Sequence, residues 1–333
     1  MSETLLGVDV GGTRTSAGLV TRDGRVLVSR SQPTHGPRGG DALERLLALV
    51  DEVAAVARDR GERIAGVGAG LPGVVAMANG TVGGEAHHVP ELAGTPVARL
   101  LAEHVGAPAF IDNDVNALAL AEWFWGAGRG ARSLVLLAIG TGVGGGIILD
   151  GRLYRGAGGF GGELGHVPVK LDGRPCICGA RGCLKAYVAG GDLAAAAAQR
   201  FGRPVDAATL FELAATGDAT AVVVLDEALE ALAAGLTIIV NGLNPERLLL
   251  GGSIGRAFAS READLRARLA RRAYAGAVAT TRIAFIDSDK DTTVRGGAAL
   301  AVYMGGPEMA PKPPSARKRP GKAVALLDNP TAS

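Results

Sequence analysis

The sequence predicts an α/β protein of two lobes, each with a mixed sheet flanked by helices, and a cleft between the lobes. Apolar strand-like runs alternate with helical patterns along the chain, which is typical of mixed or parallel sheets covered by helices. The chain has 333 residues, more than one hydrophobic core usually covers. We expect residues 1–113 with 293–304 to form the N-terminal lobe and residues 114–292 the C-terminal lobe.

The first half begins with a predicted antiparallel meander. Its apolar runs at 4–10, 14–20 and 25–30 are joined by a Gly-Gly-Thr turn and by Asp23-Gly24, a hairpin signal. The rest of this half is predicted, from its periodicity, as helix 39–58, strand 63–69, a loop to residue 94, helix 95–104, strand 108–112 and helix 114–126.

The second half is predicted to open with strand 132–139, the loop Gly140 to Gly146, strand 146–149 and another short strand after the turn Asp150-Gly151. Helical patterns dominate beyond residue 182. The predicted elements there are helices 182–200, 206–215 and 217–241, strand 247–250, helix 255–274, strand 282–286 and helix 293–304.

A weak internal repeat relates the two halves. A shift of 127 residues places Asp23-Gly24-Arg25-Val26 on Asp150-Gly151-Arg152-Leu153. Two unrelated hairpins can share this turn, because Asp-Gly is a common hairpin dipeptide. A strand and a Gly-rich turn precede both copies, which favours duplication.

Composition and charge argue against some partners. Glycine is abundant, with 51 residues, but shows no collagen period, and the 47% hydrophobic content excludes general disorder. The net charge of +2 arises from a basic, Pro-rich tail at 305–333, because the body carries a net charge of −1. We expect a disordered tail and a body that binds no nucleic acid.

The N-terminus predicts a cytoplasmic protein. Residues 1–3 lead directly into an apolar strand without a basic, cleavable leader, and no apolar run is long enough to span a bilayer. We therefore expect no membrane partner. A reducing compartment makes clustered cysteines more typical of a metal site than of disulfides.

The first Gly-rich turn follows the first strand. Asp9, Gly11, Gly12 and Thr13 place bare backbone, a hydroxyl and a carboxylate at the end of that strand. Backbone N–H groups at such glycines can approach phosphate oxygens, and Asp9 can reach a Mg²⁺ ion directly or through water. The alternative is a plain hairpin turn with a solvated aspartate.

Two more Gly turns offer similar chemistry in the second half. Gly140, Thr141 and Gly142 follow a strand but lack the Gly-Lys-Ser/Thr of a Walker A loop, and a strand rather than a helix comes next. Gly251-Gly252 lies where a strand ends and a helix begins, where a nucleotide can lie against bare backbone. Three such turns favour one nucleotide held between two lobes.

Asp112-Asn113-Asp114 stands at a strand-to-helix junction. Asp114 is placed to act as a general base on a hydroxyl, and Asn113 can both donate to and accept from hydroxyls. Helix capping is the alternative, because Asp and Asn are preferred N-caps. Capping accounts for one of these residues but not for all three.

The cysteines Cys176, Cys178 and Cys183 lie close to His166 in the sequence. One His and three Cys supply the four N and S ligands that suit tetrahedral Zn²⁺. Four protein ligands leave no open position, so this zinc is expected to be structural and to pin the segment from Glu163 to His166.

Six stretches together carry a family resemblance. They are Asp9-Val-Gly-Gly-Thr13, Gly70-Leu-Pro-Gly73, Asn113-Asp114-Val-Asn116, Gly140-Thr-Gly-Val-Gly-Gly-Gly146, Glu163-Leu-Gly-His166 and Cys176-x-Cys178-Gly-x-x-Gly-Cys183. Over residues 4–304 the chain resembles the kinases of the ROK family (repressors, open reading frames and kinases). These belong to the sugar-kinase branch of the actin-like ATPase (ribonuclease H-like) fold.

The resemblance implies a role for each matched residue on the sugar side. Asp114 would take the proton from the sugar hydroxyl, and Asn113, Glu163 and His166 would hold ring hydroxyls, with the backbone of Gly73 nearby. His166 would bind zinc through one ring nitrogen and face the sugar with the other.

The resemblance also implies roles on the phosphate side. Asp9 would position Mg²⁺, the two Gly-Thr turns would hold the phosphates of ATP, and Gly251 with Gly252 would face the adenosine.

One position departs from the family pattern. The pattern continues Gly-Cys-x-Glu with a Glu that accepts hydrogen bonds from sugar hydroxyls, but this chain has Lys185. An ammonium only donates, so the bonding demand there is inverted. Lys185 would bind a different sugar, weaken sugar binding, or form a salt bridge to Glu163.

The resemblance implies ATP-dependent phosphorylation of a hexose hydroxyl, with glucose converted to glucose 6-phosphate. Alternatives are a kinase for N-acetylmannosamine, N-acetylglucosamine, mannose, fructose or allose, and a non-catalytic sugar-sensing regulator. The choice between ATP and polyphosphate as donor stays open. The family is often dimeric, so a homodimer is expected.

Overall fold

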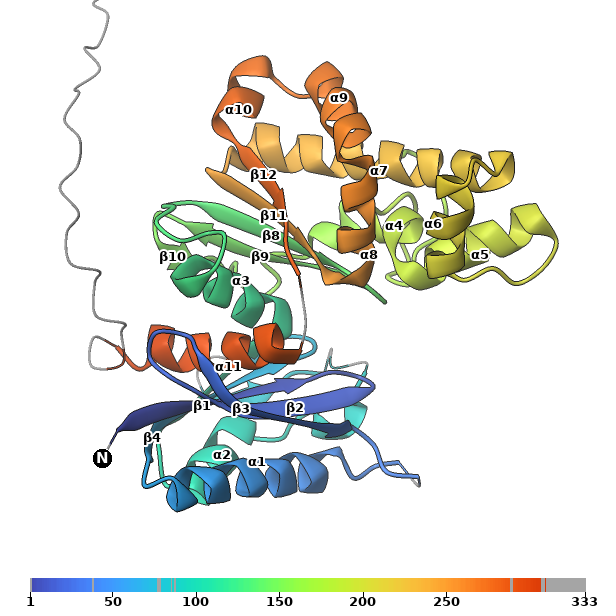
Figure 1. Cartoon of the computed structure of the whole chain (residues 1–333). Helices are drawn as coiled ribbons and strands as arrows, with labels where there is room; N and C mark the ends of the chain where they lie inside the picture. Colours follow the sequence, from blue (N-terminus) through green and yellow to red (C-terminus); the bar gives the residue numbers. More distant parts are fainter. Residues whose placement is uncertain are drawn as a thin grey trace, which may run out of the picture.

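Two five-stranded sheets with the same strand order form the two lobes of the protein (Figure 1). The structure is a computed structural model that describes residues 2–306 and 309, apart from residues 38, 77, 78, 85, 87, 288 and 289. Most of the predicted tail at 305–333 therefore lies outside the described residues, and the predicted lobe boundaries stay a prediction.

The N-terminal sheet has the order β3-β2-β1-β4-β7. Its strands are β1 (Glu3–Val10), β2 (Arg14–Val20), β3 (Val26–Pro33), β4 (Arg63–Leu71) and β7 (Ala109–Asn113). The first three form the predicted meander, and β4 and β7 run parallel to β1. Helices α1 (Ala42–Asp59) and α2 (Val97–Val105) cover one face, and α11 (Lys290–Met304) covers the other (Figure 1).

The C-terminal sheet has the order β10-β9-β8-β11-β12. Its strands are β8 (Leu134–Ile139), β9 (Val143–Leu149), β10 (Arg152–Leu153), β11 (Arg247–Gly251) and β12 (Arg282–Phe285). The helices that follow β7 are α3 (Asp114–Trp125), α4 (Lys185–Val188), α5 (Gly190–Phe201), α6 (Ala207–Ala215), α7 (Ala219–Leu243), α8 (Gly252–Ala257), α9 (Glu262–Arg272) and α10 (Ala275–Thr280).

The two sheets repeat one topology. In each, three antiparallel strands are followed by two strands parallel to the first. The two matched Asp-Gly turns connect equivalent strands, and Gly24 and Gly151 both adopt positive φ, of 84° and 74°. This agreement is what an internal duplication produces.

Several elements differ from their predicted bounds. Strand β9 begins at Val143 rather than residue 146, because its glycines lie within the strand and let α3 approach. A Cβ at Gly146 would lie 2.5 Å from the Cβ of Ala119. The predicted helix 182–200 is two helices separated at Ala189, whose ψ is 146°.

Other differences lie in the connections. The predicted helix 255–274 is divided into α8, a 3₁₀ turn at Phe258–Arg261 and α9. The predicted loop after β4 contains the short strands β5 (Val75–Ala76) and β6 (Thr81–Val82) and a 3₁₀ turn at Pro90–Leu92. Helix α10 was not expected. None of the described helices is long and apolar enough to cross a bilayer.

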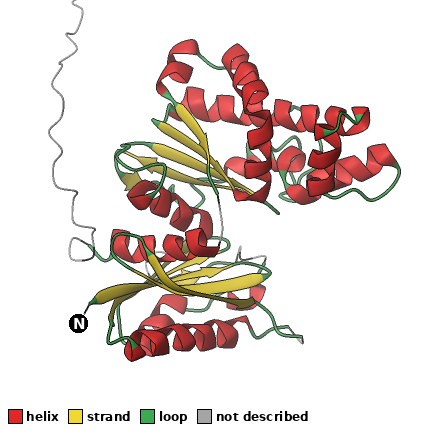
Figure 2. Cartoon of the chain, in the orientation of Figure 1, coloured by secondary structure: helices red, strands yellow, loops and turns green. Residues whose placement is uncertain are grey.

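Helices α3 and α11 lie between the two sheets, where they pack against each other (Figures 1 and 2). Glycine allows α11 to contact the N-terminal sheet backbone to backbone. A Cβ at Gly68 would lie 1.9 Å from the carbonyl oxygen of Gly297, and a Cβ at Gly7 2.0 Å from that of Val294. Any side chain here would push the helix off the sheet.

We predict that Gly68→Ala lowers the free energy of unfolding by about 1–3 kcal/mol, because the added methyl overpacks the contact between β4 and α11. Urea denaturation followed by circular dichroism measures the change. Gly242→Ala in α7 is the matched control, since open space surrounds that position. It should leave stability unchanged or raise it by up to about 1 kcal/mol. Equal stability of the two variants would contradict this packing.

Candidate active site

A cavity of about 970 Å³ opens between the turns of the two lobes. It is large enough for two small molecules side by side, at the upper end of usual ligand sites. The lining residues come from the β1–β2 turn, the ends of β4 and β7, the β8–β9 turn, the loop after β10 and the start of α8.

The carboxyl ends of β1, β4 and β7 bring the predicted acidic residues together. Asp9 pairs with Gly70 across β1 and β4, and Gly70 pairs with Asp112 across β4 and β7. Asp114 follows at the first turn of α3. A Cβ at Gly70 would lie 3.1 Å from the Cα of Asp114, so glycine at the centre lets α3 begin against the sheet.

Asn113 is the N-cap of α3. Its Oδ1 accepts hydrogen bonds from the backbone N–H groups of Val115 (2.9 Å) and Asn116 (3.2 Å). Its Nδ2 donates to the carbonyl oxygen of Gly73 at 3.2 Å. The capping alternative therefore applies to Asn113, and the cap leaves Asp114 facing the cavity.

Asp114 and Asp9 titrate near neutral pH. Burial, the charge of Asp9 and, to a smaller extent, the charge of Glu163 together raise the pKa of Asp114 to about 7. Burial likewise raises the pKa of Asp9 to about 6, opposed by a hydrogen bond from Thr293. A carboxyl group with a pKa near 7 matches the requirement for a general base at physiological pH.

Glu163 and His166 enter the cavity from a 3₁₀ turn at Leu164–His166 that lies against β9. A Cβ at Gly162 would lie 2.2 Å from the carbonyl oxygen of Gly145, and one at Gly165 2.2 Å from that of Val143. These glycines permit the close approach. The Nε2 atom of His166 lies 3.9 Å from a carboxylate oxygen of Glu163.

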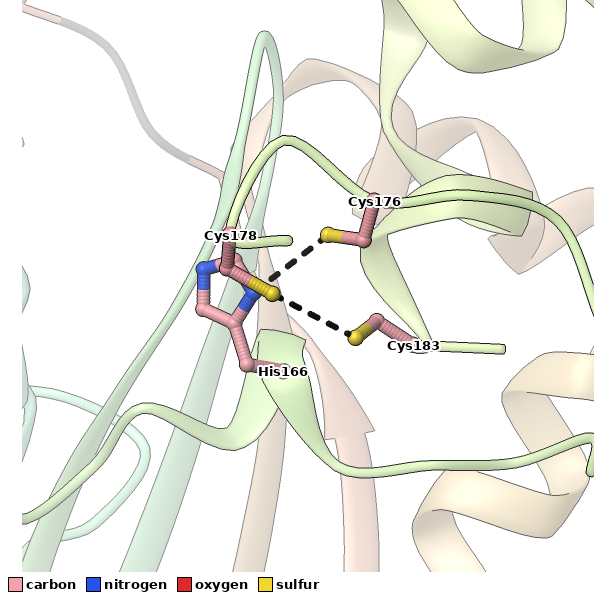
Figure 3. Close-up of side chains that lie close together, drawn as sticks. All are labelled: His166, Cys176, Cys178 and Cys183. Atoms are coloured by element: carbon pink, nitrogen blue, oxygen red, sulfur yellow. Dashed lines mark hydrogen bonds between the residues drawn. The ribbon is translucent and has the colours of Figure 1, made fainter. Parts of the chain in front are cut away.

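The other ring nitrogen of His166 faces the three cysteines (Figure 3). Its Nδ1 lies 3.5 Å from Cys176 Sγ, and the Cys178 and Cys183 sulfurs are 3.7 Å apart. All four ligand atoms lie within 4.8 Å of one another. Tetrahedral zinc with Zn–S bonds of about 2.3 Å holds two sulfurs about 3.8 Å apart, so the donor set fits that ion.

The Gly turns form the opposite wall. In the second turn the N–H of Gly140 donates to the carbonyl oxygen of Gly142 at 2.9 Å. Gly252 has a φ of +80°, and a Cβ there would lie 2.3 Å from the carbonyl oxygen of Ile139. Only glycine fits that position, which leaves bare backbone facing the cavity.

Most predicted site residues line this cavity. Those that do are Gly12, Thr13, Gly73, Asn113, Asp114, Gly140, Thr141, Gly142, Glu163, His166, Cys178 and Gly252. Asp9, Gly11 and Gly251 are adjacent in the chain or sheet but are not lining residues.

Lys185 also lies away from the lining. Its ammonium bonds to Asp192 in α5 at 2.8 Å, rather than to Glu163 as one alternative expected. The ammonium of Lys185 and the carboxylate of Asp192 therefore form an ion pair outside the cavity.

Two ring side chains in the cavity lining, those of His88 and Phe160, were not predicted. His88 lies against the first Gly-rich turn, where a Cβ at Gly12 would approach its Cβ to 2.9 Å, and Phe160 lies in the loop after β10 with 55% of its surface exposed. Neither belongs to a motif or a periodic pattern, so the sequence carried no signal for them.

Comparisons with known proteins agree with this geometry. The model of the ROK family matches residues 5–303. The glucokinase of Thermotoga maritima is 37% identical over 273 residues, which cover 76% of this chain and 83% of that protein.

Solved structures match over nearly the whole chain. The ROK hexokinase from Thermus thermophilus is 30% identical with a TM-score of 0.77, covering 91% of this chain and 99% of its own. The ROK glucokinase from Streptomyces griseus, in complex with glucose and AMPPNP, is 27% identical with a TM-score of 0.72. The match covers 91% of this chain and 100% of that chain. The predicted actin-like fold is confirmed, and the chain belongs to the ROK family.

Proposed function

We propose that the protein is an ATP-dependent sugar kinase that phosphorylates a hydroxyl of glucose. The observation that carries this proposal is the position of Asp114. Its carboxylate lies in a cavity bordered by Gly turns on one side and by Asn113, Glu163 and His166 on the other. The similarity to glucokinases supports glucose as the substrate.

The sugar would be held by groups of complementary chemistry. Glu163 offers acceptor oxygens to ring hydroxyls, and the Nε2 atom of His166 lies beside it. Asn113 has committed its oxygen to the helix cap and one amide hydrogen to the carbonyl oxygen of Gly73, so its second amide hydrogen is left to orient a hydroxyl. These contacts would place one hydroxyl against Asp114.

Asp114 would accept the proton of that hydroxyl while the hydroxyl oxygen of the sugar bonds to the terminal phosphorus of ATP. The bond from that phosphorus to the ADP oxygen breaks, and the protonated carboxyl later returns its proton to water. Phosphoryl transfer has a loose transition state, so alignment of the hydroxyl contributes more than base strength.

The phosphate side would rely on backbone rather than on basic side chains. Among the described residues that line the cavity, none is Lys or Arg. The backbone N–H groups of the two turns, other than that of Gly140, which already donates to Gly142, are therefore the proposed donors to phosphate oxygens. Asp9 and the Thr13 hydroxyl offer the oxygen ligands that Mg²⁺ prefers, and that ion supplies charge neutralisation when bound.

Zinc would hold the sugar-facing wall together. Its four ligands join the turn that carries Glu163 and His166 to the loop 176–183. Burial raises the pKa of Cys183 to about 12, and binding of the ion would displace that proton. We keep the cytoplasmic location and the homodimer as predictions.

We predict that wild-type protein releases ADP fastest with glucose in a panel that includes N-acetylmannosamine, N-acetylglucosamine, mannose, fructose and allose. Asp114→Asn should lower kcat about 10²–10⁴-fold, because it removes the base. Asp150→Asn, at an exposed hairpin turn, is the control and should keep full activity. No turnover with any sugar would end the kinase proposal, and an active Asp114→Asn would remove Asp114 as the base.

The pH dependence follows from the raised pKa values. We predict that kcat/KM for glucose falls about tenfold per pH unit below about 7 as Asp114 becomes protonated, and more steeply below about 6 as Asp9 follows.

The folded pKa of Asp114 exceeds the ordinary value of 3.8, so its ionisation destabilises the fold as pH rises from about 4 to about 7. Asp114→Asn should therefore raise Tm at pH 8. A flat rate profile down to pH 5 would contradict the assignment.

We predict one zinc ion per chain, measured by elemental analysis of the purified protein. Cys178→Ser should lower the zinc content and raise the KM for glucose more than that for ATP, because only the sugar-facing wall depends on the ion. His104→Gln is the control, since His104 pairs with Asp51 on the surface of α2. Unchanged zinc content in Cys178→Ser would show that the cluster is not the site.

A further inference from the structure

Arg155 contacts three parts of the chain around the cavity without being a lining residue. It lies two residues after β10 and begins the Gly-rich loop that ends at Glu163. Its side chain is 22% exposed, and its Nε donates to the Oδ2 of Asp112 at 2.6 Å. This ion pair connects the loop after β10 to the end of β7.

The carboxylate of Asp112 is buried and fully engaged. The residue is 3% exposed, and its Oδ1 accepts from the backbone N–H of Asn113 at 2.7 Å and from Asn116 Nδ2 at 2.9 Å. Asp112 therefore contacts both the residue before Asp114 and Asn116 in the first turn of α3. A displacement of Asp112 would therefore also displace the start of α3, which carries Asp114.

The backbone of Arg155 holds the other end of the link. Its carbonyl oxygen accepts from the N–H of Gly161 at 2.7 Å, which closes the loop 155–161 into a tight ring. A Cβ at Gly161 would lie 2.5 Å from the carbonyl carbon of Arg155, so the ring closes only around glycine. Glu163 stands two residues beyond this closure.

The guanidinium is also held from a third direction. It lies over the ring of Tyr303 in α11, 5.8 Å from the ring centre, and its Nη2 lies 3.9 Å from the sulfur of Met304. The Tyr303 hydroxyl accepts from the backbone N–H of Leu153 at 3.0 Å. These contacts use the planar face and the fork of arginine, which lysine does not possess.

We propose that Arg155 is a positioning residue that fixes the distance between Glu163 and the pair Asn113–Asp114, and so aligns the sugar hydroxyl with the base. The inference rests on the proposed function. In the proposed site the sugar is held from the loop side by Glu163, and its hydroxyl is deprotonated from the α3 side by Asp114, so both halves of the site depend on the Arg155–Asp112 pair. A misplacement of 1 Å at such a site can cost about 10²-fold in rate.

The nucleotide side is independent of this link. Arg155 has no described contact with Gly140, Thr141 or Gly142, whose turn is closed by its own hydrogen bond. A positioning role therefore predicts an effect on the sugar and not on ATP. A purely structural role predicts a loss of stability with unchanged kinetic constants in the protein that remains folded.

The test compares Arg155→Met with Arg132→Met in the full chain. Arg132 pairs with Asp150 at the same 2.6 Å in the same lobe, but both side chains are about four-fifths exposed. We expect Arg155→Met to raise the KM for glucose and lower kcat, each about tenfold, while the KM for ATP stays within about twofold. Arg132→Met should match the wild type, and Arg155→Lys should recover part of the loss.

A buried, unpaired Asp112 can unfold Arg155→Met, so the double variant Arg155→Met/Asp112→Asn keeps the test decisive. It removes both charges and should regain the wild-type Tm without regaining sugar affinity. Recovery of both, or equal changes in the two KM values, would overturn the proposal.

Glucose binding measured by calorimetry without ATP separates this proposal from the proposed function. Weaker binding by the double variant supports positioning even if wild-type turnover is absent, in which case the kinase proposal alone fails. A wild-type chain that binds none of the sugars overturns both.

Discussion

The structure depends on two carboxylates, Asp9 and Asp114, that the ends of β1 and α3 hold near each other despite their repulsion. Burial and this repulsion together raise the pKa of Asp114 to about 7. The arrangement is unfavourable for folding once both groups are charged, so the surrounding packing must hold it. Gly70 permits it at the centre of the site, since any side chain there would displace the start of α3.

Glycine provides the close contacts that hold this arrangement. Gly7 and Gly68 bring α11 onto the N-terminal sheet, and Gly146 brings α3 onto the C-terminal sheet. Helices α3 and α11 also pack against each other, and a Cβ at Gly296 would lie 3.2 Å from the backbone of Ala117, so close backbone contacts help to join the two sheets. Rigid backbone positions two lobes more accurately than flexible side chains do, which suits a reaction that depends on alignment.

The sequence predicted the parts of the fold and site that depend on local pattern. Strand and helix order follow from periodicity, and the Gly turns, the Asp-Asn-Asp junction and the His/Cys cluster are short motifs. The division of helix 182–200 at Ala189 was missed because the apolar pattern continues across it, while the N–H of Gly190 bonds to the distant carbonyl of Gly140. His88 and Arg155 were also missed, because only tertiary contacts, which no local sequence pattern reports, bring them to the site.

The specificity of the sugar wall follows from how its carboxylate is held. Lys185, which replaces the Glu of the family pattern, pairs with Asp192 in α5, so its positive charge does not face the cavity. Glu163 then remains as the acidic lining residue of the C-terminal lobe that we propose to face the sugar. Its position is set from one side by the His166 cluster and from the other by the loop that Arg155 closes. A change of sugar preference in this chain therefore requires movement of that loop rather than a new charge at Lys185.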